Sequence, residues 1–325
     1  MCGACAGSLG PDGGVRRGRP AGVLRRACGA AGSVPRVEWA ALGRVAWACA
    51  ARAQRPGGGP TAPRSPLPSA DQGAVLLAAA AAGHRESTLH RLEDHLRTTP
   101  PEQLSALLDP LSRQLRQRSG TTCGSACLVT ARALADPVYA LWLLEGFDAR
   151  TGQHAAADLG ERFAAAERVV HARTTAPVLP GGRWQVPWPR ALGTPPWAVA
   201  TELTRIWAGV RGGGVPADGG AGPVARFRTR LVDPDDEGSR RAAAEAVAAA
   251  VAGGRVAALF VGDGATPRHV TLAVGAEGPV LAVYEPGSGD VVQVPSAELV
   301  AGRTVLGGWD RLWAVVVPGQ TPSAG

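Results

Sequence analysis

The sequence predicts an α+β fold, in which a helical N-terminal half packs on an antiparallel β-sheet formed by the C-terminal half. Three observations lead to this prediction. Leucines recur at helical spacing over 87–118, alanine-rich helical segments continue to residue 209, and short β-type runs follow residue 226. Helical segments followed by strand segments are a chain order typical of α+β domains.

The helical half is divided by proline, glycine and threonine positions. Helices are predicted, in chain order, over 87–99, 101–118, 124–135, 137–147, 155–173 and 197–209. Pro101 suits the first turn of its helix, and the charged residues of 155–173 are predicted to fall on one face. A loop rich in proline, tryptophan and glycine, 176–196, precedes the last of these helices.

From residue 226 the pattern changes to short runs rich in valine. Strands are predicted over 226–232, 255–263, 268–276, 279–286, 290–295 and 311–318. One alanine-rich helix, 236–254, lies between the first two strands and ends at a glycine pair, and a short helix is expected near 296–302. These strands are the basis for the predicted antiparallel sheet.

The first 69 residues have the composition of a tail and linker. Residues 1–60 contain nine arginines against two acidic residues, which accounts for the whole net charge of +7. They lack apolar periodicity and are predicted to be disordered, as is 321–325. Between these ends we predict one domain, 70–320, with a Trp/Pro-rich insertion around 174–197.

Composition also limits the expected partners and compartment. Because the excess positive charge is confined to the tail, no nucleic-acid partner is expected. The longest apolar run, 74–83, is about half the length of a membrane span, and no secretory signal is recognisable. A cytoplasmic protein without a span is therefore expected, with a secreted protein as the alternative. Cys2 and Cys5 have zinc spacing but no second ligand pair, so neither a metal nor another cofactor is expected.

The segment 116–137, RQRSGTTCGSACLVTARALADP, carries the strongest functional signal. Thr121 and Thr122 are suitable N-cap residues, which places Cys123 at the start of the next helix, where free amides and the helix dipole stabilise a thiolate. Gln117 stands six residues earlier, so its amide can join the backbone N–H of Cys123 in a two-donor oxyanion hole. Taken alone, Cys123 also fits a small buried apolar residue.

A base and an acid for this thiol are found far along the chain. His269 opens a predicted strand directly after a turn, where an imidazole can protrude at a sheet edge. Glu285 ends the neighbouring strand sixteen residues later, and a hairpin of that length can bring its carboxylate beside the imidazole. Each residue alone also fits a polar strand end. Together they give the order Gln–Cys–His–acid that thiol hydrolases use.

The segment QRSGTTCGSACL resembles the active-site segment of the C39-type, papain-like cysteine peptidases, in which a glutamine stands six residues before the nucleophile. Segments 193–206, 250–275 and 280–299 resemble later parts of that family in the same order, so the resemblance spans 100 to 318. It implies a papain-like fold and peptide substrates.

Carried over by position, the resemblance implies a role for each matching residue. Cys123 is implied as the nucleophile, His269 as general base and acid, Glu285 as the orienting carboxylate and Gln117 as the oxyanion donor. The family has Asp or Asn where this chain has Glu285. Cys127 is expected to be buried one helical turn on, although a papain-like Cys-Gly-Ser-Cys alignment would make it the nucleophile instead.

Three residues are candidates for substrate binding. Gly124 follows the nucleophile, and Trp184 and Trp188 belong to a loop that could form a wall or lid of the cleft, or merely pack against Trp197. The leading functional prediction is a thiol peptidase or amidase acting on a peptide or protein substrate. A catalytically inactive peptide- or protein-binding relative, and a deamidase or transglutaminase-like modifier of proteins, are the alternatives.

Overall fold

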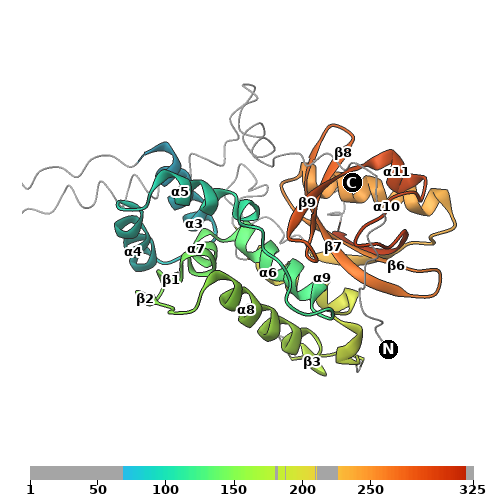
Figure 1. Cartoon of the computed structure of the whole chain (residues 1–325), viewed down its shortest axis with the longest axis horizontal. Helices are drawn as coiled ribbons and strands as arrows, with labels where there is room; N and C mark the ends of the chain where they lie inside the picture. Colours follow the sequence, from blue (N-terminus) through green and yellow to red (C-terminus); the bar gives the residue numbers. More distant parts are fainter. Residues whose placement is uncertain (1–68, 180–181, 187, 209, 211–225, 320–325) are drawn as a thin grey trace, which may run out of the picture.

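The computed structural model describes residues 69–319, apart from 180–181, 187, 209 and 211–225 (Figure 1). The tail predicted over 1–69 lies outside the described residues up to position 68, as does the predicted C-terminal segment 321–325. The α+β prediction is confirmed, because a helical N-terminal half is followed by an antiparallel sheet.

Helices account for most of the N-terminal half. Asp158 and Glu161 form a capping box at the start of one of them, and Asp136 accepts hydrogen bonds from first-turn amides of another. Within the described ranges no single helix is long and apolar enough to cross a membrane. The helices Cys123–Ala135 and Pro137–Glu145 pass the length and composition test only together, as a pair bent by 118°. In chain order the described helices are α3 (Ala70–Ala81), α4 (Glu86–Leu96), α5 (Pro101–Leu108), η2 (Pro110–Arg113), α6 (Cys123–Ala135), α7 (Pro137–Glu145), α8 (Leu159–Thr174), η3 (Arg190–Leu192), α9 (Pro196–Ala208), α10 (Glu237–Ala252) and α11 (Ser296–Val300).

The helix predicted over 101–118 is too long. Helix α5 ends at Leu108 because Asp109 precedes a proline, which disfavours the helical conformation, and Asp109 has φ −130° and ψ 77°. Pro110 then starts the short 3₁₀ turn η2, and residue 114 adopts the left-handed conformation. The chain that follows is irregular rather than helical, so Gln117 lies on a loop.

The sheet is antiparallel with six strands in the order β5-β10-β6-β7-β8-β9. Their bounds are β5 (Phe227–Leu231), β6 (Ala257–Gly262), β7 (Pro267–Glu277), β8 (Val280–Glu285), β9 (Asp290–Pro295) and β10 (Arg311–Pro318). Two short pairs were not predicted, namely β1 (Phe147–Asp148) with β2 (Gln153–His154) and β3 (Val178–Leu179) with β4 (Arg183–Trp184). Strand β7 lies inside the sheet, between β6 and β8, which corrects the expectation that His269 stands at a sheet edge.

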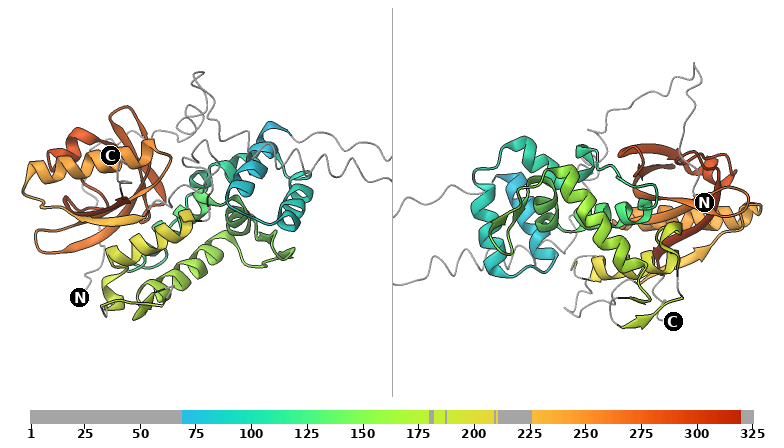
Figure 2. Two further views of the ribbon diagram at one scale, coloured as in Figure 1. Left: turned by 180° about the vertical axis from the view of Figure 1, so that it is seen from behind. Right: turned by 60° about the horizontal axis from the view of Figure 1, so that its bottom comes forward.

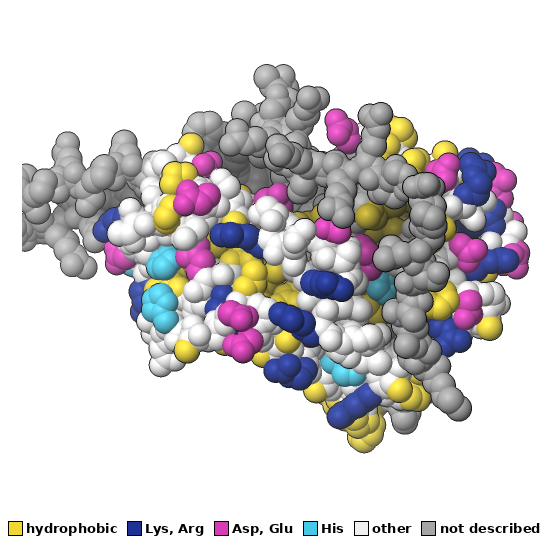
Figure 3. Space-filling view, viewed as in Figure 1, with side chains coloured by type: hydrophobic (Ala, Val, Ile, Leu, Met, Phe, Trp, Pro, Cys, Tyr) yellow, Lys and Arg dark blue, Asp and Glu magenta, His cyan; other side chains and the backbone are white. Residues whose placement is uncertain are grey.

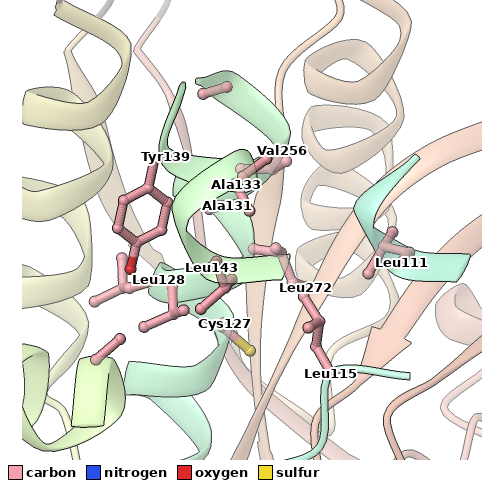
Figure 4. Packing of buried hydrophobic residues seen from close by; sticks show 14 of the residues in the cluster. Leu111, Leu115, Cys127, Leu128, Ala131, Ala133, Tyr139, Leu143, Val256 and Leu272 are labelled. Atoms are coloured by element: carbon pink, nitrogen blue, oxygen red, sulfur yellow. The ribbon is translucent and has the colours of Figure 1, made fainter. Parts of the chain in front are cut away.

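Helices cover both faces of the sheet (Figure 2). One hydrophobic cluster joins the helical half to the sheet and includes Leu92, Leu128, Leu272, Tyr284 and Val316. Figure 4 shows part of it, with Leu128 of α6 beside Tyr139, and with Leu115 and Leu272 on the other side of Cys127. A second cluster lies between α10 and the other sheet face and includes Val247, Leu259, Val283 and Val315. Helix α6 therefore packs against the sheet, with its first residue near the start of β7.

Candidate active site

The first residue of α6 is Cys123, so the helix begins one residue before the predicted range 124–135. Its side chain is buried, with 5% of the residue exposed. The first-turn amides of a helix are free of intrahelical partners and, with the helix dipole, favour an anion at this point. Thr122 is the N-cap residue, but its hydroxyl makes no capping bond and is directed to Ser119 and Glu167 instead.

Gly124 and Ser125 seat the start of α6 against a distant turn. A Cβ added to Gly124 would lie 2.9 Å from the Cβ of Thr194, so this position accepts no side chain without movement. The hydroxyls of Ser125 and Thr194 are 3.0 Å apart, and Thr194 is itself buried. Gly124 is thus buried against protein, and its predicted contact with substrate stays a prediction.

His269 and Glu285 are paired across the β7–β8 hairpin. Nε2 of His269 lies 2.6 Å from Oε1 of Glu285, and each side chain is only 11% exposed. The same carboxylate oxygen accepts a hydrogen bond of 3.0 Å from the backbone N–H of Gly287, which fixes its position. Strand pairing of Leu272 with Tyr284 brings the end of β8 to the start of β7.

The His269 imidazole lies between the Glu285 carboxylate and the Cys123 thiol. Burial lowers the pKa of His269, but hydrogen bonds to Cys123 and to Glu285 outweigh burial and raise that pKa from 6.5 to about 10. Because Nε2 faces Glu285, Nδ1 is the nitrogen left for the thiol. The structure therefore brings Cys123 together with two residues that lie 146 and 162 positions further along the chain.

Cys127 is inaccessible and unsuited to the nucleophile's role. It is 1% exposed, and its Sγ donates to the backbone oxygen of Val270 at 3.4 Å. Burial, followed by the nearby charges of Cys123 and Glu285, raises the pKa of its thiol well above the ordinary value. Cys127 thus connects α6 to the strand that carries His269, as a buried packing residue.

Gln117 lies against the turn that follows Glu285. Its backbone N–H donates to the carbonyl of Pro286 at 2.9 Å, and Nε of Arg116 donates to the carbonyl of Gly287 at 2.8 Å. The side-chain Oε1 of Gln117 is buried without a hydrogen-bond partner in the described part of the chain, and Nε2 is engaged by no bond there. The loop thus places a free amide donor next to the His–Glu hairpin.

A cavity of about 400 Å³ opens beside Gln117. Three aromatic or aliphatic side chains and two guanidinium groups contribute to it; its lining is Gln114, Leu115, Arg116, Gln117, Arg118, Leu159, Gly160 and Phe163. The predicted oxyanion donor is thus itself part of the lining of this space.

The two predicted substrate-binding tryptophans do not line that cavity. Trp184 lies on β4 with 81% of its surface exposed. Figure 3 shows hydrophobic side chains at the lower end of the molecule, where Figure 1 places β3, the partner strand of β4. Trp188 packs edge-on against Trp197, with ring centroids 5.2 Å apart. For Trp188 the structure shows the aromatic packing that the sequence left open, and a substrate contact at either residue stays a prediction.

Sequence reasoning missed three residues that surround the site. Glu167 and Thr194 are buried beneath the start of α6, and Gly307 lies against the His269 ring, where an added Cβ would be 2.5 Å from the ring's Cδ2. The glycine pair in "VLGGWD" could have signalled a close backbone approach. The sequence of helix α8 did not indicate that Glu167 is buried. Its charged residues were predicted to fall on one face, whereas Arg162 and Glu167 are buried.

The site has no metal-binding character in the described residues, where no group of three or more His, Cys, Asp or Glu side chains is arranged to hold an ion. Cys2 and Cys5 lie outside those residues.

Comparison with known proteins gives no relative, because no family model, no curated protein and no solved structure matches this chain. Any functional assignment therefore depends on the geometry and chemistry of the site itself.

Proposed function

We propose that the protein is a cysteine peptidase or amidase that acts on peptide or protein substrates, with the papain-like fold implied by its sequence resemblance. The observation that supports this most directly is the His269 imidazole, which pairs with Glu285 at 2.6 Å and whose pKa is raised by its interaction with the Cys123 thiol. An imidazole between a thiol and a carboxylate can take the thiol proton while the carboxylate holds the ring and stabilises its charge.

The proposed reaction passes through a thioester. His269 first takes the proton of Cys123, and the resulting thiolate sulfur then bonds to the substrate carbonyl carbon while the carbonyl π electrons move onto oxygen. The backbone N–H of Cys123 and Nε2 of Gln117 donate to that oxyanion. The imidazolium then protonates the leaving amine as the C–N bond breaks. A water that loses its proton to His269 hydrolyses the thioester and regenerates the thiol.

Glu285 supports an active enzyme despite the Asp or Asn expected from the resemblance. The longer side chain reaches the imidazole at 2.6 Å, and Gly287 anchors it through the backbone. This contact favours an active enzyme over a catalytically inactive binding module. A deamidase or transglutaminase-like enzyme would use the same thiol, and product mass separates it from a peptidase, since only the peptidase cuts the chain.

The test is the alkylation rate of each cysteine at mildly acidic pH, where an ordinary thiol with a pKa of about 8.5 is mostly protonated. Iodoacetamide is small enough to probe a recessed thiol, and peptide mass mapping assigns the label. The cysteines of residues 1–68 serve as internal references: Cys2, Cys5, Cys28 and Cys49. We expect Cys123 to react faster than these, and His269→Ala to abolish the difference.

The matched control is Cys127→Ala, which removes a second sulfur from the same helix and should leave the rate at Cys123 high. A mixed peptide library should be cleaved by the wild type and not by Cys123→Ala. A Cys123 that reacts no faster than the reference cysteines, in a protein that cleaves nothing, contradicts the proposal. Mass changes without chain cleavage would point to the protein-modifying alternative.

A further inference from the structure

Glu167 is a buried carboxyl group that the proposed reaction does not use. It projects from α8, is 1% exposed, and contacts the loop that joins Gln117 to Cys123. The backbone N–H of Arg118, at the beginning of this loop, donates to Oε2 at 3.3 Å. At the end of the loop, the hydroxyl of Thr122 lies 3.1 Å from Oε1. One side chain therefore holds both ends of the segment between oxyanion donor and nucleophile.

The hydrogen atoms around Thr122 indicate the protonation state of Glu167. The threonine hydroxyl lies within hydrogen-bond distance of two oxygens, the Ser119 carbonyl at 3.0 Å and Glu167 Oε1 at 3.1 Å, yet it carries one hydrogen. A carbonyl and an ionised carboxylate can only accept, so an ionised Glu167 leaves one contact without a hydrogen. A protonated Oε1 supplies it, donating to Thr122, which donates to Ser119.

The surroundings favour this neutral form. Burial raises the pKa of Glu167, and the hydrogen bonds from Arg118 and Thr122, with the charges of Arg118 and Arg168, lower it only in part, which leaves it at about 7 rather than 4.5. Cys127 of α6 and Tyr284 of β8 are the other titratable groups that face it, and both favour its neutral form when ionised. Glu167 therefore changes charge near neutral pH.

We propose that Glu167 is a positioning residue: it carries a proton in the working protein, fastens the Gln117–Cys123 loop through Thr122, and loosens that loop when it ionises. The protonation itself is independent of the proposed peptidase function. The consequence for Cys123 rests on that function. A loosened loop changes the position of the thiol relative to its oxyanion donor, Gln117, and so slows the attack of Cys123 on a substrate carbonyl.

The test compares wild type with Glu167→Gln as a function of pH. Glutamine mimics the protonated acid, since Nε2 can donate to Thr122 while Oε1 accepts from Arg118. The alkylation rate of Cys123 in the variant, divided by that in the wild type, should be near one at pH 5.5 and rise severalfold by pH 8.5. Taking this ratio cancels the ionisation of the thiol. A ratio that is independent of pH would overturn the proposal.

A second pair of variants covers the case in which Glu167→Gln folds poorly. Thr122→Val removes the hydroxyl that joins Glu167 to Ser119 and should slow Cys123 at pH 5.5, where Glu167 is protonated, whereas Thr122→Ser keeps this hydroxyl and should behave as wild type. Equal rates for these two variants at pH 5.5 would contradict the proposed role of Glu167.

An infrared measurement tests the protonation of Glu167 separately from the catalytic proposal. The carboxylic acid C=O band that is present in wild type and missing in Glu167→Gln should disappear with an apparent pKa near 7, also in a Cys123→Ala background. If it does so while Cys123 shows no enhanced reactivity, the peptidase proposal fails and the protonated Glu167 stands. A band lost near the ordinary carboxyl pKa of about 4.3 overturns the protonation claim.

Discussion

At the scale of single residues, His269 depends most on its neighbours. It is buried, which alone would keep the imidazole neutral, yet the Cys123 thiol and the Glu285 carboxylate raise its pKa to about 10. A raised pKa means that the ring is charged below that pH in the folded protein and loses its proton only as the pH rises through about 10. The imidazolium needed to protonate a leaving amine is therefore available throughout the neutral range.

Replacing Glu285 by Gln should lower the pH at which His269 loses its proton. Glutamine can still accept a hydrogen bond from His269 but has no charge, so the pKa of His269 falls and the alkaline limb of kcat/KM shifts to lower pH. A hydrogen bond to a charged group contributes about 1.5–3 kcal/mol, so kcat/KM should drop by roughly tenfold to a hundredfold. Steady-state rates on a cleavable peptide across pH measure both effects.

The matched control for this change is Glu277→Gln, at the far end of β7, where the side chain is exposed. It removes one negative charge from the same hairpin and should leave the pH profile unchanged. An identical shift in both variants would mean that net charge, rather than the contact with His269, sets the alkaline limb.

Residue types and their order were enough to predict which side chains meet, but not what surrounds them. Cys123, His269 and Glu285 were identified because a thiol at a helix start needs a base and an acid. Glu167 was missed, since a glutamate on an amphipathic helix looks the same in sequence whether it faces water or a loop. Burial depends on what packs against α8, and the sequence does not encode that locally.

At the scale of elements, the turn between α11 and β10 acts as a backbone cover for the His–Glu pair. Gly307 has φ +58°, and a Cβ there would lie 2.7 Å from Nε2 of His269 and 3.2 Å from Oε2 of Glu285. Gly307→Ala should therefore displace the ring, and the alkylation rate of Cys123 should fall at least about tenfold, since a contact under 3.0 Å forces something to shift.

Gly308 provides the control for Gly307 because an alanine there has the same kind of backbone strain but meets no neighbouring atoms. Its φ is +85°, so alanine is strained there too, but nothing lies within 4 Å of the added Cβ. Both variants should lose about 1 kcal/mol of unfolding free energy to backbone strain, and only Gly307→Ala should slow Cys123. Equal rates in the two would show that the turn does not position His269.

The elements themselves were predictable where local signals are strong. The strands of the C-terminal half follow the predicted runs closely, because β-branched residues between glycines and prolines leave few alternatives. The helix predicted over 101–118 failed because leucine spacing was given more weight than Pro110, and the irregular loop that results is what brings Gln117 to the hairpin. The short pair of β3 and β4 has only two residues per strand, too few for a period to appear.

At the scale of the whole molecule, one hydrophobic cluster contains residues from both halves. Leu128 of α6, Leu272 of β7 and Val316 of β10 belong to the same buried set, so the helical half cannot separate from the sheet without exposing it. The site depends on this continuity, since Cys123 comes from one half, and His269 and Glu285 come from the other. The predicted α+β class implied two halves in contact but did not identify which residues join them.

Leu272→Ala tests this coupling. Leu272 is fully buried, and removing a buried leucine side chain costs about 2–5 kcal/mol, according to how far the cavity collapses. If the two halves unfold as one unit, hydrogen exchange followed by mass spectrometry should show peptides from α4–α7 and from β6–β10 losing protection at the same, lower denaturant concentration. Leu231→Ala, on β5 with 79% exposure, should change stability by less than about 0.5 kcal/mol. Two separate transitions, with only the sheet peptides destabilised, would mean that the halves fold independently and that alignment of Cys123 with His269 requires docking after folding.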